Sequence, residues 1–262
     1  MKELLRKYNI RPSRSRGQNF LVNKGIAEKI INAAELSRED TVLEIGPGLG
    51  ILTERLIRYA GRVIAVEKDK RLYDFLSEKL KDIRNLELIN ADILYLQPTT
   101  YNLQLGYKIV ANIPYNITGQ FFKKFLSADN RPETVVVMVQ KEVGERLLGK
   151  KDRSLLTLAA ELYGRAEKVC DVSPGSFEPS PAVSSMVVRL AIGRREPLEQ
   201  KIFHFAKIGF SSRRKKLISN LSTGLKKDKK YLKDAFDRLG LNHNVRAEEL
   251  SKTDWLKLAE SL

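Results

Sequence analysis

The stretch VLEIGPGLG, residues 42–50, decides the fold of this 262-residue chain. An apolar strand pattern runs directly into three alternating glycines, Gly46, Gly48 and Gly50, and apolar residues then recur at helical spacing. Glycine lets the backbone turn sharply and lets a ligand lie against the turn, because no Cβ stands in the way. The stretch therefore predicts a strand, a ligand-binding turn and a helix.

Segments of strand-forming residues recur after this stretch. They are continuously apolar and lie at residues 62–67, 86–90, 107–112 and 133–140. Amphipathic helices are predicted before or between the strands, at residues 23–36, 52–60, 70–80 and 119–126. Continuous apolar strands that alternate with helices indicate a parallel sheet with both faces covered and right-handed crossovers. The expected class is therefore α/β with a Rossmann-like sheet.

The alternation loosens after residue 140. A helix is predicted at residues 154–164, and two strands at residues 166–173 and 184–192 predict an antiparallel addition at the sheet edge. The composition then shifts at GRREP, residues 193–197, and the remainder of the chain is helical and basic. We expect a Rossmann-like domain at residues 23–192 and a small all-helical domain at residues 193–262.

The formal charge of +15 is concentrated in two segments. Residues 1–19 carry six Lys or Arg and one acid, and residues 213–233 carry nine and one. Neither segment has a strongly apolar helix face with Trp or Phe, so a polyphosphate partner is favoured over a membrane surface. A solvated surface without a partner is the alternative reading. A helix through Arg213, Arg214, Lys215 and Lys216 would spread them around its circumference, so two or three of them, with Lys226 and Lys227, are expected to contact RNA.

The composition argues against several other kinds of site. Cys170 is the one cysteine and lies in a predicted strand, so a disulfide or thiolate-rich metal site is not expected. The two histidines, His204 and His243, lie near no motif, which makes a histidine metal site or triad improbable. The sequence has no membrane-length apolar run and no signal peptide at its start, so a cytoplasmic protein is expected.

Acids follow two of the predicted strands. Glu67 ends one strand, where a carboxylate can accept both hydroxyls of a ribose, and as a strand-end acid it is expected to lie outside the core. Asp92 follows the next strand at the same edge, where an acid can accept the exocyclic amine of adenine. A dinucleotide and S-adenosylmethionine both fit such a pocket. The glycine spacing differs from the dinucleotide phosphate fingerprint, which favours S-adenosylmethionine.

The segment KIVANIPYNITG, residues 108–119, ends a further strand at this edge. Pro114 prevents the strand from continuing directly into a helix and fixes the backbone before it. The Asn112 side-chain oxygen and the Ile113 carbonyl can then accept the two hydrogens of a nucleobase amine and direct its lone pair at a methyl group. Tyr115 offers a face on which an unstacked base can lie. The pattern favours methylation of a base amine, with catalysis mainly by positioning.

Eight motifs in order resemble the KsgA-type small-subunit ribosomal RNA adenine dimethyltransferases. They are SRGQNFLVN, VLEIGPGLGILTERL, VEKD, NADIL, NIPYNITG, FEPSPAVSS, FSSRRKKLISNL and RAEELS, and they span nearly the whole chain. The resemblance implies transfer of four methyl groups to two adjacent adenosines near the 3′ end of 16S rRNA. The implied partner is 16S rRNA within the immature 30S subunit, bound by a monomer.

The resemblance also implies roles for individual residues. Residues 1–22 would complete the active site, and Phe177 would be a second base-stacking aromatic. The implied cofactor contacts, in addition to Gly48 of the glycine turn, are Asn19, Leu21, Gly46, Glu67, Asp92 and Asn112. Two alternatives remain: an erythromycin-resistance type of large-subunit rRNA methyltransferase, which shares NIPYN, and a nucleic-acid-binding factor that has lost catalysis.

Overall fold

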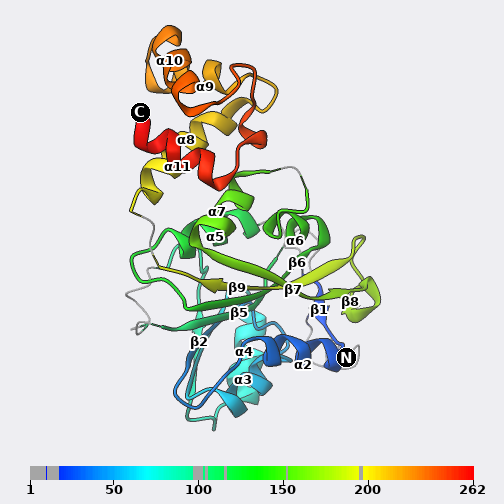
Figure 1. Cartoon of the computed structure of the whole chain (residues 1–262). Helices are drawn as coiled ribbons and strands as arrows, with labels where there is room; N and C mark the ends of the chain where they lie inside the picture. The colour runs from blue at the N-terminus through cyan, green and yellow to red at the C-terminus, as the bar shows by residue number, and fades with distance from the viewer. Residues whose placement is uncertain are drawn as a thin grey trace. The chain divides into compact units, whose positions relative to one another are not determined.

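The computed structural model describes residues 10, 18–96, 103, 106–114, 117–151, 153–194 and 197–262. The chain divides into two compact units (Figure 1). Unit 1 consists of Met1–Gly144 and Ala166–Ile192, and unit 2 of Glu145–Arg165 and Gly193–Leu262. The expected boundary at residue 193 coincides with the second entry of the chain into unit 2. Residues 145–165, which we expected in the first domain, fall in unit 2 instead.

Unit 1 is built on a seven-stranded sheet of order β4-β3-β2-β5-β6-β9-β7. The five strands from β4 to β6 are parallel, and β9 is antiparallel to β6, with Val137 opposite Val188. In sheet order, the strands are β4 Leu86–Asn90, β3 Arg62–Glu67, β2 Thr41–Ile45, β5 Lys108–Asn112, β6 Thr134–Gln140, β9 Ser185–Ile192 and β7 Gly164–Val172. The predicted parallel sheet with an antiparallel addition is confirmed.

Apolar side chains from alternate strand positions cover one face of this sheet. Val42, Val63 and Val110 are fully buried there against Ile30 and Leu56 of two helices. The sheet is flanked by α2 Lys24–Ala33, α3 Thr53–Tyr59, α4 Lys70–Lys79 and α5 Thr118–Leu126, with α5 on the side opposite α2 and α3 (Figure 1). Because both faces are covered, the strand ends are where a ligand can reach the sheet.

A second, two-stranded sheet was not predicted. The strand β1 (Phe20–Leu21) pairs antiparallel with β8 (Phe177–Glu178), so that Leu21 lies opposite Phe177. The Val22 N–H donates to the Ser176 carbonyl over 2.9 Å and extends the pairing. Figure 1 shows the two strands side by side although they lie far apart in the sequence. The N-terminal segment is thereby fixed to the loop that carries Phe177.

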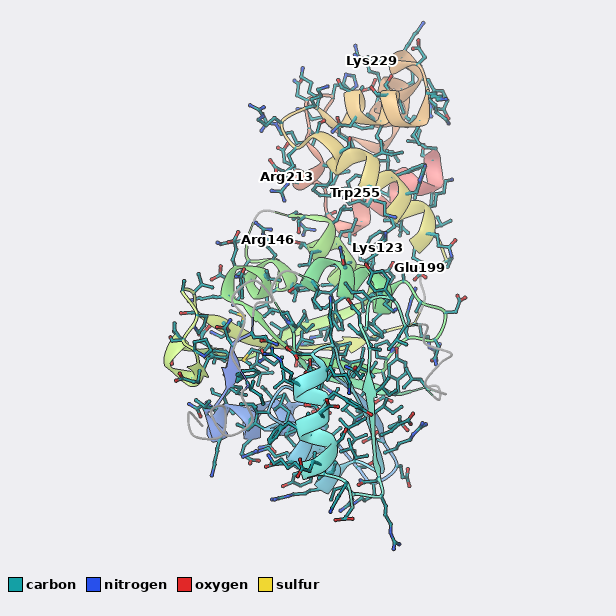
Figure 2. All side chains as sticks on the ribbon, turned by 180° about the vertical axis from the view of Figure 1, so that it is seen from behind. Lys123, Arg146, Glu199, Arg213, Lys229 and Trp255 are labelled. Carbon is teal, nitrogen blue, oxygen red and sulfur yellow. The ribbon has the colours of Figure 1, made fainter. Side chains whose placement is uncertain are left out.

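Unit 2 is helical in its described part. Its helices are α7 Leu155–Tyr163, α8 Glu199–Gly209, α9 Leu217–Leu225, α10 Lys229–Leu239 and α11 Lys252–Ser261. Trp255 of α11 is 1% exposed and stacks on Phe210 (Figure 2). Gly209 makes room for it, since a Cβ there would lie 2.7 Å from the indole ring. Gly209 of α8 and Trp255 of α11 are thereby in close contact.

Two local features differ from the sequence-based expectation. The helix α6 (Lys141–Leu147) directly follows β6 and was not predicted. Residues 213–216 form a turn between the short 3-10 helix η5 (Phe210–Ser212) and α9. The prediction of a helix through these four residues is therefore wrong. Among the residues that the structure describes, no helix has the length and apolar character needed to cross a membrane.

Candidate active site

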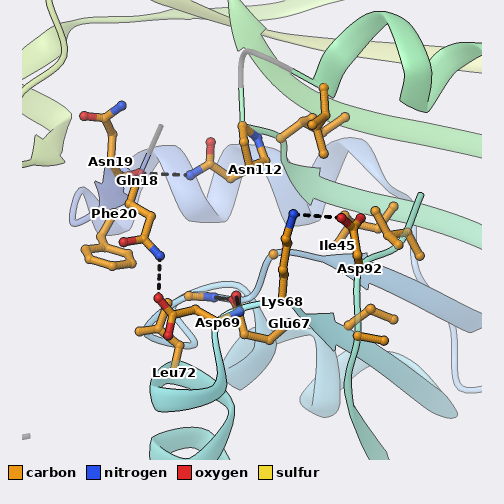
Figure 3. A pocket seen from close by; sticks show the side chains of 18 of the residues that line it. Gln18, Asn19, Phe20, Ile45, Glu67, Lys68, Asp69, Leu72, Asp92 and Asn112 are labelled. Atoms are coloured by element: carbon orange, nitrogen blue, oxygen red, sulfur yellow. Dashed lines mark hydrogen bonds and ion pairs between the residues drawn. The ribbon is translucent and has the colours of Figure 1, made fainter. Parts of the chain in front are cut away.

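A cavity of about 370 Å³ opens at the carboxyl ends of the parallel strands of unit 1 (Figure 3). The glycine loop after β2, the end of β3, the loop after β4 and the end of β5 all line it, together with the N-terminal segment. Among its lining residues are Asn19, Gly46, Glu67, Asp92, Asn112 and Phe177. The predicted convergence of strand ends therefore places most of the candidate residues around one cavity.

The glycine loop and Glu67 form one hydrogen-bonded unit. Gly48 has φ +59°, and a Cβ on it would lie 3.1 Å from the Phe20 ring. Its N–H donates to Glu67 Oε2 over 3.1 Å, and the Asp69 N–H donates to Oε1 over 2.8 Å. Glu67 is 6% exposed, contrary to the expectation of an acid outside the core, and burial raises its pKa. Each carboxylate oxygen keeps a lone pair with which to accept a ligand hydroxyl.

Asp92 lies across the cavity from Glu67. Its Oδ1 accepts the Leu94 N–H over 2.9 Å, and its Oδ2 lies 2.8 Å from Lys68 Nζ (Figure 3). Burial alone would raise the Asp92 pKa, but the hydrogen bonds from Lys68 and Leu94 outweigh burial and hold the pKa below its ordinary value. Asp92 is therefore an ionised acceptor at neutral pH.

The end of β5 presents Asn112 to the cavity. Its Nδ2 donates to the Asn19 carbonyl oxygen over 3.3 Å, which leaves Oδ1 as the acceptor. Ile113 follows with its side chain fully buried, and its N–H donates to the Met138 carbonyl over 3.3 Å. Pro114 also lines the cavity. The backbone that carries the Ile113 carbonyl is thus fixed on both sides.

The N-terminal segment is attached to the cavity by polar contacts. Gln18 Nε2 donates to Asp69 Oδ2 over 3.1 Å (Figure 3). Asp69 also accepts from the Arg71 guanidinium. The contacts with Arg71 first, and with Gln18, hold the Asp69 pKa far below its ordinary range. Asp69 is thus ionised at any pH at which the protein works and anchors Gln18 as a charged acceptor.

The structure does not establish the predicted roles of Phe177, Leu21 and Tyr115. Phe177 lines the cavity but is 4% exposed and shares an apolar cluster with Leu21. Leu21 does not line the main cavity; it borders a smaller hollow behind the glycine loop. Tyr115 lies outside the described residues. The roles of all three stay predictions.

Sequence reasoning missed three polar residues of the cavity: Gln18, Lys68 and Asp69. Gln18 precedes Asn19, which was singled out. Lys68 and Asp69 follow Glu67, which was also singled out. The charged run EKDK, residues 67–70, was the available signal. It did not indicate which of its side chains turn toward the cavity, because a turn after a strand has no fixed side-chain period.

The basic residues of unit 2 that we expected to contact RNA lie at two turns. Residues 213–216 are all exposed, and Lys226, also exposed, ends α9 with φ 54°. Figure 2 shows Arg213 at the surface of this unit. Lys227 differs, since its Nζ lies 4.4 Å from the Tyr231 ring centroid and donates to the Leu262 carbonyl over 3.1 Å. An internal role for Lys227 competes with the predicted RNA contact.

The chain is similar to a known family over nearly its full length. It matches the family model described as ribosomal RNA adenine dimethylase over residues 10–262. The chain belongs to the ribosomal RNA adenine dimethylase family. This membership confirms the resemblance drawn from the sequence motifs and identifies the chain as an adenine dimethyltransferase of ribosomal RNA.

Individual relatives agree with the family. The ribosomal RNA small subunit methyltransferase A of Dehalococcoides mccartyi is 42% identical over 98% of this chain and 90% of its own length. The protein of the same name from Halothermothrix orenii is 37% identical over 98% and 93%.

Two solved structures support the fold. A dimethyladenosine transferase from Plasmodium falciparum has a TM-score of 0.77 at 30% identity and covers 91% of this chain and 95% of its own. The 23S rRNA methyltransferase ErmE has a TM-score of 0.73 at 28% identity, over 93% and 99%. The Rossmann-like methyltransferase class expected from the sequence is confirmed.

Proposed function

We propose that this chain transfers methyl groups from S-adenosylmethionine to the N6 amines of two adjacent adenosines near the 3′ end of 16S rRNA, during assembly of the small ribosomal subunit. The observation that carries the proposal is the meeting of Glu67, Asp92 and Asn112 at one cavity of about 370 Å³ in a chain of this family. The curated relatives that are 35–42% identical carry the small-subunit name, which favours this substrate over large-subunit RNA.

The donor set fits the cofactor. The buried Glu67 carboxylate suits the ribose hydroxyls, Asp92 suits the adenine amine, and Gly48 leaves space beside the loop. Gly46 and Asn19 complete this part of the lining, and Leu21 supports the loop from behind. When bound, S-adenosylmethionine supplies an electrophilic methyl group on a sulfonium.

The residues at the end of β5 hold the target amine. An adenine amine is a poor nucleophile because its lone pair is delocalised into the ring. Asn112 Oδ1 and the Ile113 carbonyl accept its hydrogens, which draws the nitrogen toward tetrahedral geometry and localises the lone pair. The bond from Asn112 to the Asn19 carbonyl keeps the amide oriented for this role. No general base is needed, since the methylated nitrogen is acidic enough to release its proton to water.

Aromatic and basic residues bind the RNA in this proposal. Tyr115 and Phe177 stack on the flipped adenine, and the exposed basic turns of unit 2 contact phosphates. We also propose that the protein acts as a monomer. The ribosomal substrate places the reaction in the cytoplasm.

The test is methyl transfer to ribosomal particles. The purified protein, labelled S-adenosylmethionine and immature 30S particles from cells that lack this activity are combined, and the product is mapped as N6,N6-dimethyladenosine. Label in two adjacent adenosines of 16S rRNA supports the proposal. Label in 50S particles instead would favour the large-subunit type of enzyme, and binding without transfer would indicate a non-catalytic RNA-binding protein.

A further inference from the structure

The two oxygens of the Asp92 carboxylate have partners of different kinds. Oδ1 accepts a backbone N–H, that of Leu94, which belongs to the same turn and moves with it. Oδ2 is paired with the side chain of Lys68, a residue of the neighbouring strand end, over 2.8 Å. Figure 3 shows the Lys68 ammonium pointing across the cavity at this oxygen. Oδ2 is therefore the oxygen whose protein partner can be exchanged.

The position of Asp92 itself is held from behind. Lys124 of α5 donates to the carbonyl oxygens of Leu94 and Leu96, which fixes the loop after β4. Asn90 Nδ2 donates to the Glu67 carbonyl over 2.8 Å and ties the end of β4 to that of β3. The Asp92 carboxylate is therefore held in place when a ligand amine binds to it.

Lys68 has the opposite character. Its side chain is 76% exposed, whereas that of Asp92 is 18% exposed. An ammonium on a flexible stem at this exposure leaves an ion pair at little cost, because water replaces its partner. Of the two members of the pair, Lys68 is the one that moves.

We propose that Lys68 competes with the adenine amine of the cofactor for Oδ2 of Asp92, and so lowers the affinity of the pocket for adenine ligands. The inference rests on the proposed function, since it takes Asp92 as the acceptor of that amine. Both groups are N–H donors that approach Oδ2 from the cavity, which Lys68 itself lines. Displacement of Lys68 thus accompanies binding, and the lysine weakens adenine ligands more than ligands that lack the amine.

The test compares two exposed lysines that lie two positions apart. Lys68→Met removes the charge and keeps an apolar stem of similar length. Lys70→Met is the matched control, because Lys70 is 72% exposed, pairs with Asp74 outside the cavity over 2.6 Å and loses the same charge. The probe is S-adenosylhomocysteine, which carries no sulfonium, so that a general loss of positive charge has little effect on its binding. Affinities are measured by calorimetric titration.

Lys68→Met is expected to tighten S-adenosylhomocysteine about two- to fivefold, the range that an ion pair with an exposed partner contributes. Lys70→Met is expected to leave the affinity unchanged. S-inosylhomocysteine, in which a carbonyl oxygen replaces the amine, is expected to bind Lys68→Met no more tightly than the wild type. In an Asp92→Asn background, Lys68→Met is expected to lose its effect, because the charge for which it competes is gone.

The results that overturn the inference are equally specific. Unchanged or weaker binding of S-adenosylhomocysteine to Lys68→Met would show that Lys68 is neutral or holds the ligand. Equal tightening in Lys70→Met, or of the inosine analogue, would show a general charge effect. A wild type that does not bind S-adenosylhomocysteine would instead overturn the proposed function, and the inference with it.

Discussion

The side-chain amide of Asn112 donates to the backbone carbonyl of Asn19 over 3.3 Å and joins the end of β5 to the N-terminal segment. This bond leaves the carboxamide oxygen as the free acceptor of the group. The orientation of the proposed catalytic amide is thus set by a residue that precedes the sheet.

Asn112→Ala is expected to lower the single-turnover rate of methyl transfer by at least ~10²-fold, about 2.7 kcal/mol, because the acceptor for the target amine is removed. RNA affinity should stay nearly unchanged, and cofactor affinity should fall only modestly. Rapid-quench measurement at saturating cofactor checks the rate. A variant with more than half of the wild-type rate would contradict the role of Asn112.

Glu67→Ala is expected to weaken S-adenosylmethionine binding by roughly 1.5–3 kcal/mol, because charge-assisted hydrogen bonds to the ribose are removed. The same change should destabilise the fold by about 1–3 kcal/mol, because the buried N–H groups of Gly48 and Asp69 lose their acceptor. Calorimetric titration and urea unfolding check the two effects separately. Unchanged cofactor affinity in a folded variant would mean that the ribose site lies elsewhere.

Phe177→Leu separates stacking from packing. Phe177 is buried in an apolar cluster, so Phe177→Ala should lower both the free energy of unfolding and turnover. Leucine restores most of the apolar volume without the aromatic face, so the leucine variant should be near wild type in stability and reduced in turnover. Turnover equal to wild type in the leucine variant would make Phe177 a packing residue.

Glu44 should make stability fall with rising pH. It lies on β2 with 1% exposure, and its contacts with Thr53 lower the pKa by less than burial raises it. Burial raises its pKa from 4.5 to about 8, with the nearby Glu67 charge acting in the same direction. The folded state therefore holds a proton that the unfolded state releases. The stability that this proton confers is complete below pH 4.5 and is lost as the pH rises through about 8.

Glu44→Gln is the matching experiment, since the amide cannot ionise. Between pH 5 and pH 8.5 the wild type should lose on the order of 4 kcal/mol more unfolding free energy than the variant. Urea titrations at both pH values measure the difference. Parallel pH dependence of wild type and variant would show that Glu44 is not protonated in the fold.

The exposed basic turns of unit 2 should set the salt dependence of RNA binding. Replacing Arg213, Arg214 and Lys226 by Gln should weaken 30S binding and reduce the slope of log affinity against log salt by about one unit for each phosphate that is no longer bound. Buried Asn220 supports the first turn through its bond to the Ser212 carbonyl over 3.0 Å, so the turn should keep its shape. Equal slopes and affinities would leave these residues as solvated surface.

Lys227→Gln is a contrasting variant. Because Lys227 contacts Tyr231 and the Leu262 carbonyl, its replacement should lower the melting temperature and leave the salt slope near that of the wild type. A slope change as large as that of one exposed residue would restore Lys227 to the RNA contact surface.

The sequence predicted those parts of the site that follow from topology. Gly48, Glu67, Asp92 and Asn112 each end or follow a parallel strand, and parallel strands bring such residues to one edge whatever their side-chain details. The pairing of Leu21 with Phe177 could not be read in the same way, because two-residue strands have no period and their register depends on distant loops.

The contacts between side chains that line the cavity could not be predicted from the sequence either. Lys68 was not singled out in the sequence, and only the spatial order of β3 and β4 brings it to Asp92. Gln18 likewise meets Asp69 from 51 positions away. Local patterns carry no information on such contacts, which depend on the assembled fold.

The pairing of β1 with β8 bears on the order in which the protein folds during its synthesis. Asn23 and Ser176, which share a hydrogen bond beside this pair, are 153 positions apart. Contacts of such separation close late, because the entropy of a long loop must be overcome first. On the translating ribosome, the glycine loop and its acids emerge long before Phe177 is made. We therefore expect the lining of the cavity to stay incomplete in the nascent chain until Phe177 has been synthesised.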